Sequence, residues 1–518
     1  MAKRPEQRPS WRSRLQALLH RERDVIVAEI GPGAQDVIVG KNIIRIGSLV
    51  VPALPAIVAL LATLALAAFL IWWITVPARM GEDTFNVAVA EFGQIRQGRV
   101  EASTDGQIAS RTLFTTLRAE LEAKAGTDQM AEYRPLVWHD SMSFLQKRAV
   151  IGMVQGADAE ARRQAACARA RELNVTIFVY GYLNLDSSPP TLEQEFCVRT
   201  PKQDLGDIAE VESTNRVGMP VPVDLPLSGT VDKAAVNTPL RIRNTLMTQI
   251  VIGLSYEITG RYTRAQEIFQ DALAHLESSR SSRAAPGSDG EDVVHYFIGR
   301  EYFFLGQNPA QPLEAKINYF SQAQNEFELA LVNPAYLRAR LALGSTFYQR
   351  AQLLAQQQQP FESEIKRAIA EQTQVLREAS PSDNRSVLVQ DALSLGLSHW
   401  LDGYHLLQAG DQPAAQAAFG WARQYAEFGR QWSLPDEHRF TAAAHMIDGL
   451  TYDYAGQEFR RRGEPEAAAE QFRQAGQAYA ACVDQGKYDS IDAFLNQHLI
   501  GDTCKPSLAR VRALLASS

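Results

Sequence analysis

From Leu240 onward, apolar residues follow a helical spacing almost without interruption. Between residues 80 and 185, short apolar runs alternate with longer amphipathic stretches, which predicts strands at 85–92, 135–140 and 175–183 and helices at 108–125 and 158–173. Alternating strands and helices favour a small α/β sandwich with a largely parallel sheet. The chain is therefore predicted to be an α+β multidomain protein that is mostly α-helical.

Residues 48–76 contain no charged side chain. Within them, residues 53–74 supply the roughly 20 apolar residues that cross about 30 Å of hydrocarbon, so we expect one transmembrane helix. Many lysines and arginines precede this stretch and Arg79 alone follows closely. The positive-inside rule then predicts a single-pass cell-membrane protein with a cytoplasmic N-terminus and an extracytoplasmic bulk.

Before this stretch, residues 24–46 carry short runs of β-branched residues that are broken by glycine and proline. Three such strands bury little alone, so either they stack on copies from neighbouring chains, giving self-association, or they are loosely ordered. The formal net charge is −7, and the basic residues gather in this N-terminal tail. The acidic remainder predicts no nucleic-acid binding.

One motif recurs in the helical half at a period of about 34 residues. Its first copy has small residues, aromatics and a turn glycine at Gly253, Tyr256, Gly260, Tyr262, Ala265, Phe269 and Ala272. The register returns at Gly403, Gly410, Ala415, Phe419 and Ala422, and again at Gly456, Gly463, Ala468, Phe472 and Ala475. This spacing resembles the tetratricopeptide repeat. The resemblance implies stacked helical hairpins in a curved solenoid, with a groove lined by the first helices.

Two further copies are degenerate. In one, Gly299 and Tyr302 are separated from Ala323, Phe327 and Ala330 by about a dozen extra residues, which we interpret as an insertion. In the other, Gly344 and Tyr348 open a copy whose second helix, at 361–379, fits only loosely. Five hairpins are therefore expected, and Asn333-Pro334 is expected to close the split one.

Aromatic and arginine side chains dominate binding energy at interfaces, and an extended or helical peptide suits a solenoid groove. The groove-facing candidates are Tyr296, Arg300, Arg338, Tyr348, Trp400, Tyr404, Arg460 and Arg461. An acidic protein or peptide is the expected partner, and reversing the charge of Arg300 or Arg461 is expected to weaken its capture without lowering the melting temperature. The alternative is that half of these aromatics pack between repeats.

No nucleotide-binding, metalloprotease or nucleophile-elbow motif occurs, so no catalytic residue, cofactor or metal is predicted. Trp138-His139-Asp140-Ser141 contains the residue types of a nucleophilic relay, but neighbours on a strand point to opposite faces, so they are not expected to meet. The acidic segment 288–292 is interpreted as solvated linker rather than a calcium loop. Among the four cysteines, Cys482 and Cys504 form the first candidate disulfide, with free thiols as the alternative.

The α/β arrangement also resembles small domains that precede repeat or propeller domains in some bacterial envelope proteins, which implies a recognition or docking module. The predicted function is a membrane-anchored scaffold that binds a partner in the groove. The alternative is an envelope sensor whose α/β domain binds a ligand and signals across the membrane. The expected regions are 1–47 (basic tail), 48–76 (membrane helix), 80–185 (α/β domain), 186–239 (proline-rich connector with a strand at 192–199), 240–485 (solenoid) and 486–518 (C-terminal capping helix).

Overall fold

The computed structural model divides into two compact units, residues 1–77 and 78–518, which are described separately. It describes residues 26–28, 37–40, 43–46, 49–52, 58, 60–68, 79–81, 84–127, 134–142, 150–199, 213–227, 238–279, 290–435, 437–488 and 496–516. Most of the predicted basic tail, including residues 1–25, lies outside these ranges.

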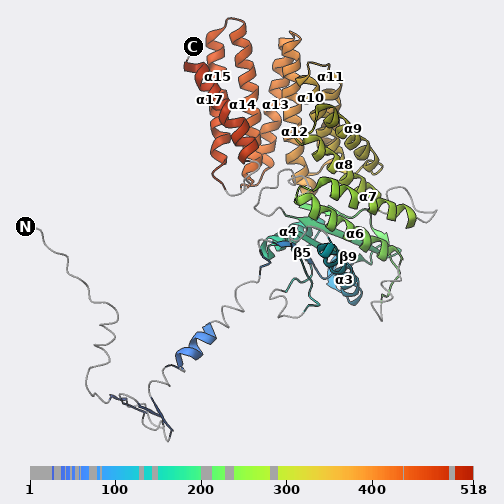
Figure 1. Cartoon of the computed structure of the whole chain (residues 1–518), viewed down its shortest axis with the longest axis vertical. Helices are drawn as coiled ribbons and strands as arrows, with labels where there is room; N and C mark the ends of the chain where they lie inside the picture. Colours follow the sequence, from blue (N-terminus) through green and yellow to red (C-terminus); the bar gives the residue numbers. More distant parts are fainter. Residues whose placement is uncertain are drawn as a thin grey trace, which may run out of the picture. The chain divides into compact units, whose positions relative to one another are not determined.

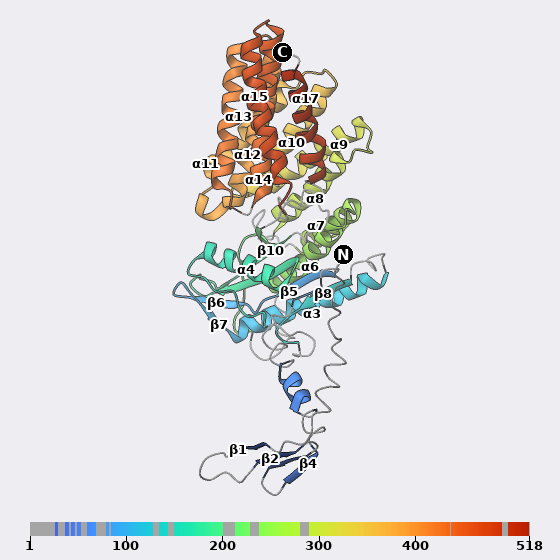
Figure 2. The same ribbon diagram turned by 90° about the vertical axis from the view of Figure 1, so that its left-hand side faces the viewer.

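The first unit contains an antiparallel sheet in the order β1-β2-β3-β4. Its strands are β1 (Ile26–Ala28), β2 (Val37–Gly40), β3 (Ile43–Ile46) and β4 (Leu49–Pro52). The β-branched runs predicted as strands within 24–46 are therefore β1 to β3, and they pair within one chain (Figure 2). Self-association through this segment stays a prediction.

The structure contradicts the predicted transmembrane helix at 48–76. Residues 49–52 form strand β4, and the helical residues described beyond it are 58 and 60–68. In the described parts of the chain, no helix has the length and hydropathy needed to span a membrane. The predicted single-pass localisation, with its cytoplasmic N-terminus and extracytoplasmic bulk, is therefore wrong.

The second unit begins with a mixed sheet in the order β11-β10-β9-β5-β8. Its strands are β5 (Thr84–Val89), β8 (Arg134–Trp138), β9 (Ile177–Asn184), β10 (Thr191–Val198) and β11 (Ser213–Arg216). The pairs β5–β8 and β5–β9 are parallel, but β9–β10 and β10–β11 are antiparallel. The prediction of a largely parallel sheet is wrong because a short turn joins β9 to β10, and a short turn permits only antiparallel pairing.

Smaller strands extend this sheet. A hairpin of β6 (Gly93–Arg96) and β7 (Arg99–Ala102) joins it through β6, which is parallel to β9. Strand β12 (Val221–Pro222) pairs with β10. The predicted connector at 186–239 thus contributes three strands to the sheet instead of only covering its edge.

Helices bury both faces of the sheet. Val87 and Val89 on β5 belong to the core that contains Leu113 and Leu117 of α3 (Thr104–Thr127). The alternate residue, Ala88, joins the opposite core with α4 (Ala159–Leu173), and a disulfide between Cys167 and Cys197 ties α4 to β10. This alternation follows from the two-residue period of a strand.

The sheet and the helical array share one hydrophobic core. Helix α6 (Thr238–Ile258) packs beside α3, and the Gln194 Nε2 of β10 donates to the Asn244 Oδ1 of α6 at 3.0 Å (Figure 2). The expected break between connector and solenoid is therefore a packed junction.

Between residues 238 and 485, the part of the chain that the structure describes forms five successive helical hairpins (Figure 1). They are α6–α7 (Tyr262–Ser279), α8 (Glu291–Gln307)–α9 (Leu313–Ala330), α10 (Leu337–Gln356)–α11 (Glu362–Glu378), α12 (Pro381–Gln408)–α13 (Gln412–Trp432) and α14 (His438–Arg461)–α15 (Pro465–Gln485).

The repeated glycines and phenylalanines form the contacts inside these hairpins. A β-carbon at Gly403 would come within 2.6 Å of the Phe419 ring, so only glycine allows this approach of the two helices. The turn glycine of the same hairpin, Gly410, has a φ of 82°. The pairs Gly253–Phe269 and Gly456–Phe472 repeat the contact. The helical region therefore has the hairpin packing that the tetratricopeptide resemblance implies.

Part of the expected insertion in the second hairpin is helical. Residues 303–307 complete α8 and residues 313–316 begin α9, which leaves a loop of only 308–312. A second close contact, between Gly306 and Phe320, forms there. The predicted acidic linker at 288–292 is also partly wrong, because Asp292 lies within α8, is buried, and accepts a hydrogen bond from Asn333 Nδ2 at 2.8 Å.

The last hairpin is closed by η3 (Asn496–Cys504) and α17 (Lys505–Ala516). Val511 of α17 packs in one core with Tyr479 of α15. Cys482 and Cys504 form a disulfide, which links α15 to the end of η3. Residues 486–518 thus supply a helix against the end of the array.

Candidate functional site

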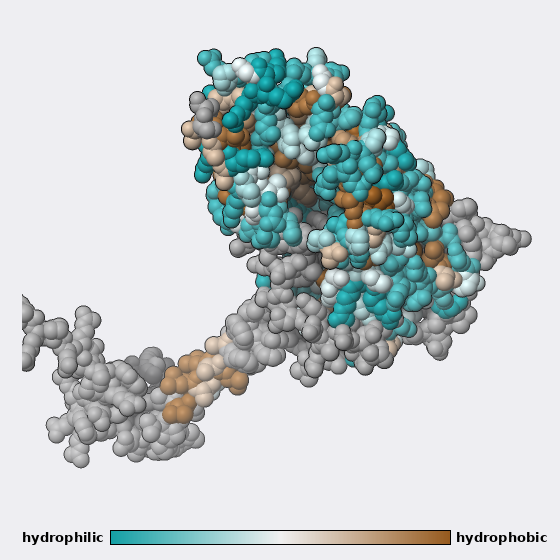
Figure 3. Space-filling view, turned by 45° about the horizontal axis from the view of Figure 1, so that its top comes forward, coloured by the Kyte–Doolittle hydropathy of each residue, from teal (hydrophilic) through white to brown (hydrophobic). Residues whose placement is uncertain are grey.

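The first helices of successive hairpins, α8, α10, α12 and α14, lie beside one another, and we call the surface they form the first-helix face. Figure 3 shows a hollow in the helical array, with hydrophobic residues in its wall. A pocket of about 140 Å³ opens on the first-helix face. Its lining residues are Phe303, Gln307, Ser345, Tyr348, Gln349, Gln372, Ser394 and Leu397.

The pocket is lined by neutral side chains from four helices. Its polar groups are the amides of Gln307, Gln349 and Gln372 and the hydroxyls of Ser345 and Ser394, and none of the lining residues carries a charge. The apolar part comes from Phe303 and Leu397 together with the ring of Tyr348. Such a wall offers both hydrogen-bond donors and acceptors next to apolar surface.

Tyr348 is the one predicted groove residue that borders this pocket. It is 7% exposed, and its hydroxyl accepts a hydrogen bond from Gln352 Nε2 at 2.7 Å. Trp400 and Tyr404 lie farther along α12, where both rings meet Tyr454 of α14 at centroid distances of 5.5 and 5.3 Å. These half-buried rings form an aromatic patch on the first-helix face.

Tyr296 and Arg300 are buried, at 1% exposure each, so neither presents a surface to a partner. The Arg300 Nη2 lies 2.8 Å from the Glu257 Oε1 of α6, and its guanidinium lies 4.9 Å from the centre of the Phe304 ring. The structure places these two residues inside the array, where Arg300 pairs with Glu257 of α6 and Tyr296 packs against Phe327 of α9.

A second acid accompanies this ion pair. Glu301 is fully buried, and its pKa is raised well above the ordinary value, first by burial and then by the neighbouring Glu257 carboxylate. Burial therefore favours the protonated form of Glu301. The Arg300–Glu257 ion pair links α8 to α6, and none of these three side chains offers an exposed charge.

The three remaining candidates lie elsewhere. Arg338 is half-buried at the start of α10, and Arg460 and Arg461 are exposed at the end of α14. Arg461 Nε and Nη2 contact the two carboxylate oxygens of Glu458 at 2.8 and 2.9 Å. The eight candidates therefore do not form one surface.

The neutral pocket residues were missed in the sequence because they are neither aromatic nor charged. A signal was nevertheless present: Ser345 and Gln349 are four residues apart on α10, the spacing of one helix face. The loose fit of the 361–379 helix was a second signal, since it marks the hairpin whose second helix carries Gln372.

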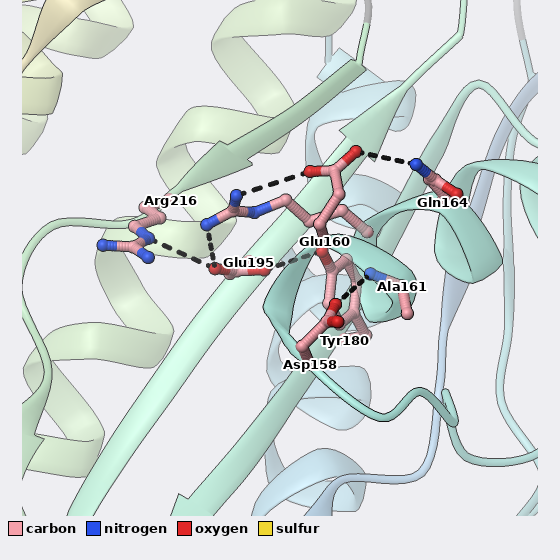
Figure 4. Close-up of polar contacts among 8 residues, drawn as sticks. Asp158, Glu160, Ala161, Gln164, Tyr180, Glu195 and Arg216 are labelled. Atoms are coloured by element: carbon pink, nitrogen blue, oxygen red, sulfur yellow. Dashed lines mark hydrogen bonds and ion pairs between the residues drawn. The ribbon is translucent and has the colours of Figure 1, made fainter. Parts of the chain in front are cut away.

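The sheet layer holds a separate polar network around the buried Glu195 (Figure 4). Tyr180 donates its hydroxyl hydrogen to Glu195 Oε2 at 2.7 Å. Arg216 Nε and Arg163 Nη2 lie 3.3 and 3.9 Å from Glu195 Oε1. Because these groups pair with one another, the network ties α4, β9, β10 and β11 together.

His139 and Ser141 meet, contrary to the expectation from strand geometry. Strand β8 ends at Trp138, and beyond it Ser141 Oγ lies 2.8 Å from His139 Nδ1, which also accepts the Ser141 backbone N–H at 3.0 Å. The Asp140 carboxylate accepts the backbone N–H groups of Ile151 and Gly152. The turn after the strand, and not the strand itself, sets these contacts.

Within the described residues, no three histidine, cysteine, aspartate or glutamate side chains are grouped to hold a metal ion. No protein-family model matches this chain, and no curated protein matches it. Among solved structures, the chain is similar to the crystal structure of a TPR-repeat protein from Bacteroides fragilis. The two share 14% identity over 53% of this chain and 98% of that chain, with a TM-score of 0.20. Since that score is low, the hairpin assignment rests on the helix packing described above.

Proposed function

We propose that this protein is an interaction scaffold that binds a segment of a partner protein on its first-helix face. The pocket among α8, α10, α11 and α12 is the observation that carries this proposal. The aromatic patch of Trp400, Tyr404 and Tyr454 supports it, because half-buried aromatic rings contribute strongly to protein interfaces.

The chemistry of the pocket changes the expected partner. No residue that lines the pocket is charged. Arg300, which lies on α8 three residues before the lining residue Phe303, is buried in an ion pair. An acidic segment would lose hydration in this pocket without gaining an opposite charge. We therefore propose that the partner segment binds through neutral polar and aromatic side chains.

Photo-crosslinking tests this proposal with matched positions. A photoreactive amino acid is placed at Gln349 or Tyr404 on the first-helix face, and at Gln374 or Trp421 on the second helices α11 and α13 as controls. We expect one protein to crosslink from both first-helix positions and from neither control, and a peptide from its crosslinked segment to bind the purified chain. Equal crosslinking from all four positions would contradict the proposal.

A further inference from the structure

We propose that the pocket beside Gln372 is a subsite for a carboxamide side chain, asparagine or glutamine, of the partner segment. This inference rests on the proposed function and adds the chemical class of the group that is recognised. Three observations carry it: the residue that stands where another hairpin has phenylalanine, the hydrogen bonding of that residue, and the neutrality of the wall.

Gln372 takes the place of a packing aromatic. In the hairpin α8–α9, a β-carbon at Gly299 would come within 2.7 Å of the Phe327 ring. In the next hairpin, a β-carbon at Gly344 would come within 2.8 Å of Gln372 Cγ, at the same separation along the chain. A glutamine therefore occupies the position at which the preceding hairpin uses phenylalanine, and the pocket lies next to it.

The Gln372 amide is only partly paired although its side chain is fully buried. Its Oε1 accepts a hydrogen bond from Ser398 Oγ of α12 at 2.8 Å, whereas its Nε2 has no partner among the described residues. An unpaired buried donor costs about 1–3 kcal/mol, and a turn of the Gln372 amide toward the adjoining pocket would let a ligand acceptor remove that cost. Gln372 is thus a residue of the pocket lining whose buried amide donor lacks an acceptor among the described residues.

The size and polarity of the pocket favour a carboxamide. Its volume of about 140 Å³ is some ten times the ~10–15 Å³ that one water needs, so a side chain fits. A carboxamide both donates and accepts, which matches a wall of amides and hydroxyls. A carboxylate or ammonium group would find no opposite charge among the lining residues.

A displayed library of random 12-residue peptides, selected on the full-length protein, tests the subsite. We expect the bound peptides to share an asparagine or glutamine at one position, and its replacement by glutamate or leucine in a synthetic peptide to weaken binding at least tenfold. Gln372→Phe, which restores the residue type of Phe327, should weaken binding by a similar factor. Ser345→Leu fills the pocket from α10 and provides a second variant if Gln372→Phe does not fold.

The control is Gln374→Leu, a change of the same residue type on the same helix outside the pocket lining, which should leave affinity unchanged. If peptides bind without an amide preference, or bind Gln372→Phe and Ser345→Leu as tightly as the unmodified protein, the subsite is wrong. In that case, loss of binding on Tyr404→Ala would leave the scaffold proposal standing. If no selected peptide depends on the first-helix face, both proposals fail.

Discussion

The neighbouring hairpins α8–α9 and α10–α11 follow one plan but differ at an inner position. Phe327 packs against Gly299 in the first, and Gln372 packs against Gly344 in the second. Burying a phenylalanine stabilises a fold by about 1.5–3 kcal/mol, whereas a buried amide with an unpaired donor costs stability. The comparison teaches that a hairpin of this array can carry an amide at the position where its neighbour packs an aromatic ring, and that a neutral polar pocket lies beside that amide.

The same two hairpins also differ in how they hold charge. Arg300 of α8 and Glu257 are 1% and 0% exposed, whereas Arg350 of α10 and its partner Glu364 are 20% and 12% exposed. A buried pair is costly to break because the remaining charge loses its partner without regaining water. The ion pair of Arg300 on α8 should therefore cost more free energy to break than the ion pair of Arg350 on α10.

The largest effect is expected from Arg300→Glu, which places a third acid beside Glu257 and Glu301. Breaking a buried pair costs about 3–5 kcal/mol, so the free energy of unfolding should fall by at least this amount. Urea denaturation followed by circular dichroism measures the change. The matched variant Arg350→Glu should cost clearly less, and equal losses would remove the proposed difference between the hairpins. The sequence-based expectation of an unchanged melting temperature for Arg300 no longer holds.

The next largest loss of stability is expected from Phe327→Gln, which gives the α8–α9 hairpin the residue that α10–α11 has at the same position. Loss of a buried phenylalanine costs about 3–5 kcal/mol, and a buried amide without partners adds a further cost. The reciprocal change, Gln372→Phe, should alter stability by only about 1 kcal/mol, because the adjoining pocket gives the ring room. Similar losses for both variants in urea denaturation would show that the two positions are equivalent.

A smaller effect concerns pH. Burial raises the pKa of Glu301, so the folded protein binds this proton more tightly than the unfolded chain. The resulting stabilisation is complete below the unfolded pKa of about 4.3 and is lost as the pH rises through the folded pKa. The variant Glu301→Gln should flatten this part of the stability profile above the unfolded pKa of about 4.3. An identical pH dependence in both proteins would show that Glu301 does not hold its proton.

The smallest effect is expected from Gln372→Leu, which removes the hydrogen bond from Ser398 but also the unpaired amide. These contributions oppose each other, so the free energy of unfolding should change by about 1 kcal/mol or less. A loss above about 3 kcal/mol in urea denaturation would identify Gln372 as a structural brace rather than a binding residue.

Prediction from the sequence succeeded where a feature depends on residues close along the chain. The contact of Gly403 with Phe419 and the turn at Gly410 repeat in other hairpins, and this periodicity can be read without a structure. It failed where a feature depends on distant segments. The apolar run at 48–76 has the hydropathy of a membrane helix, yet its residues 49–52 pair with β3.

The candidate site shows the same division. Arg300 and Gln349 both lie on first helices. The sequence around each residue does not show whether its side chain is buried or exposed. Packing against α6 buries Arg300, whereas Gln349 stays at the pocket. Aromatic and arginine side chains are good guides to interfaces only after their burial is known.

By itself, the sequence determined the hairpins, their glycine–aromatic contacts and their order, because helix periodicity and close helix approach are properties of single segments and adjacent pairs. Only the tertiary structure decided that Arg300 is internal, that the sheet layer joins the helical core, and that Gln372 borders a neutral pocket. The physical reason is that burial and hydrogen-bond satisfaction are set by helices brought together from different hairpins, whose mutual packing no single repeat specifies.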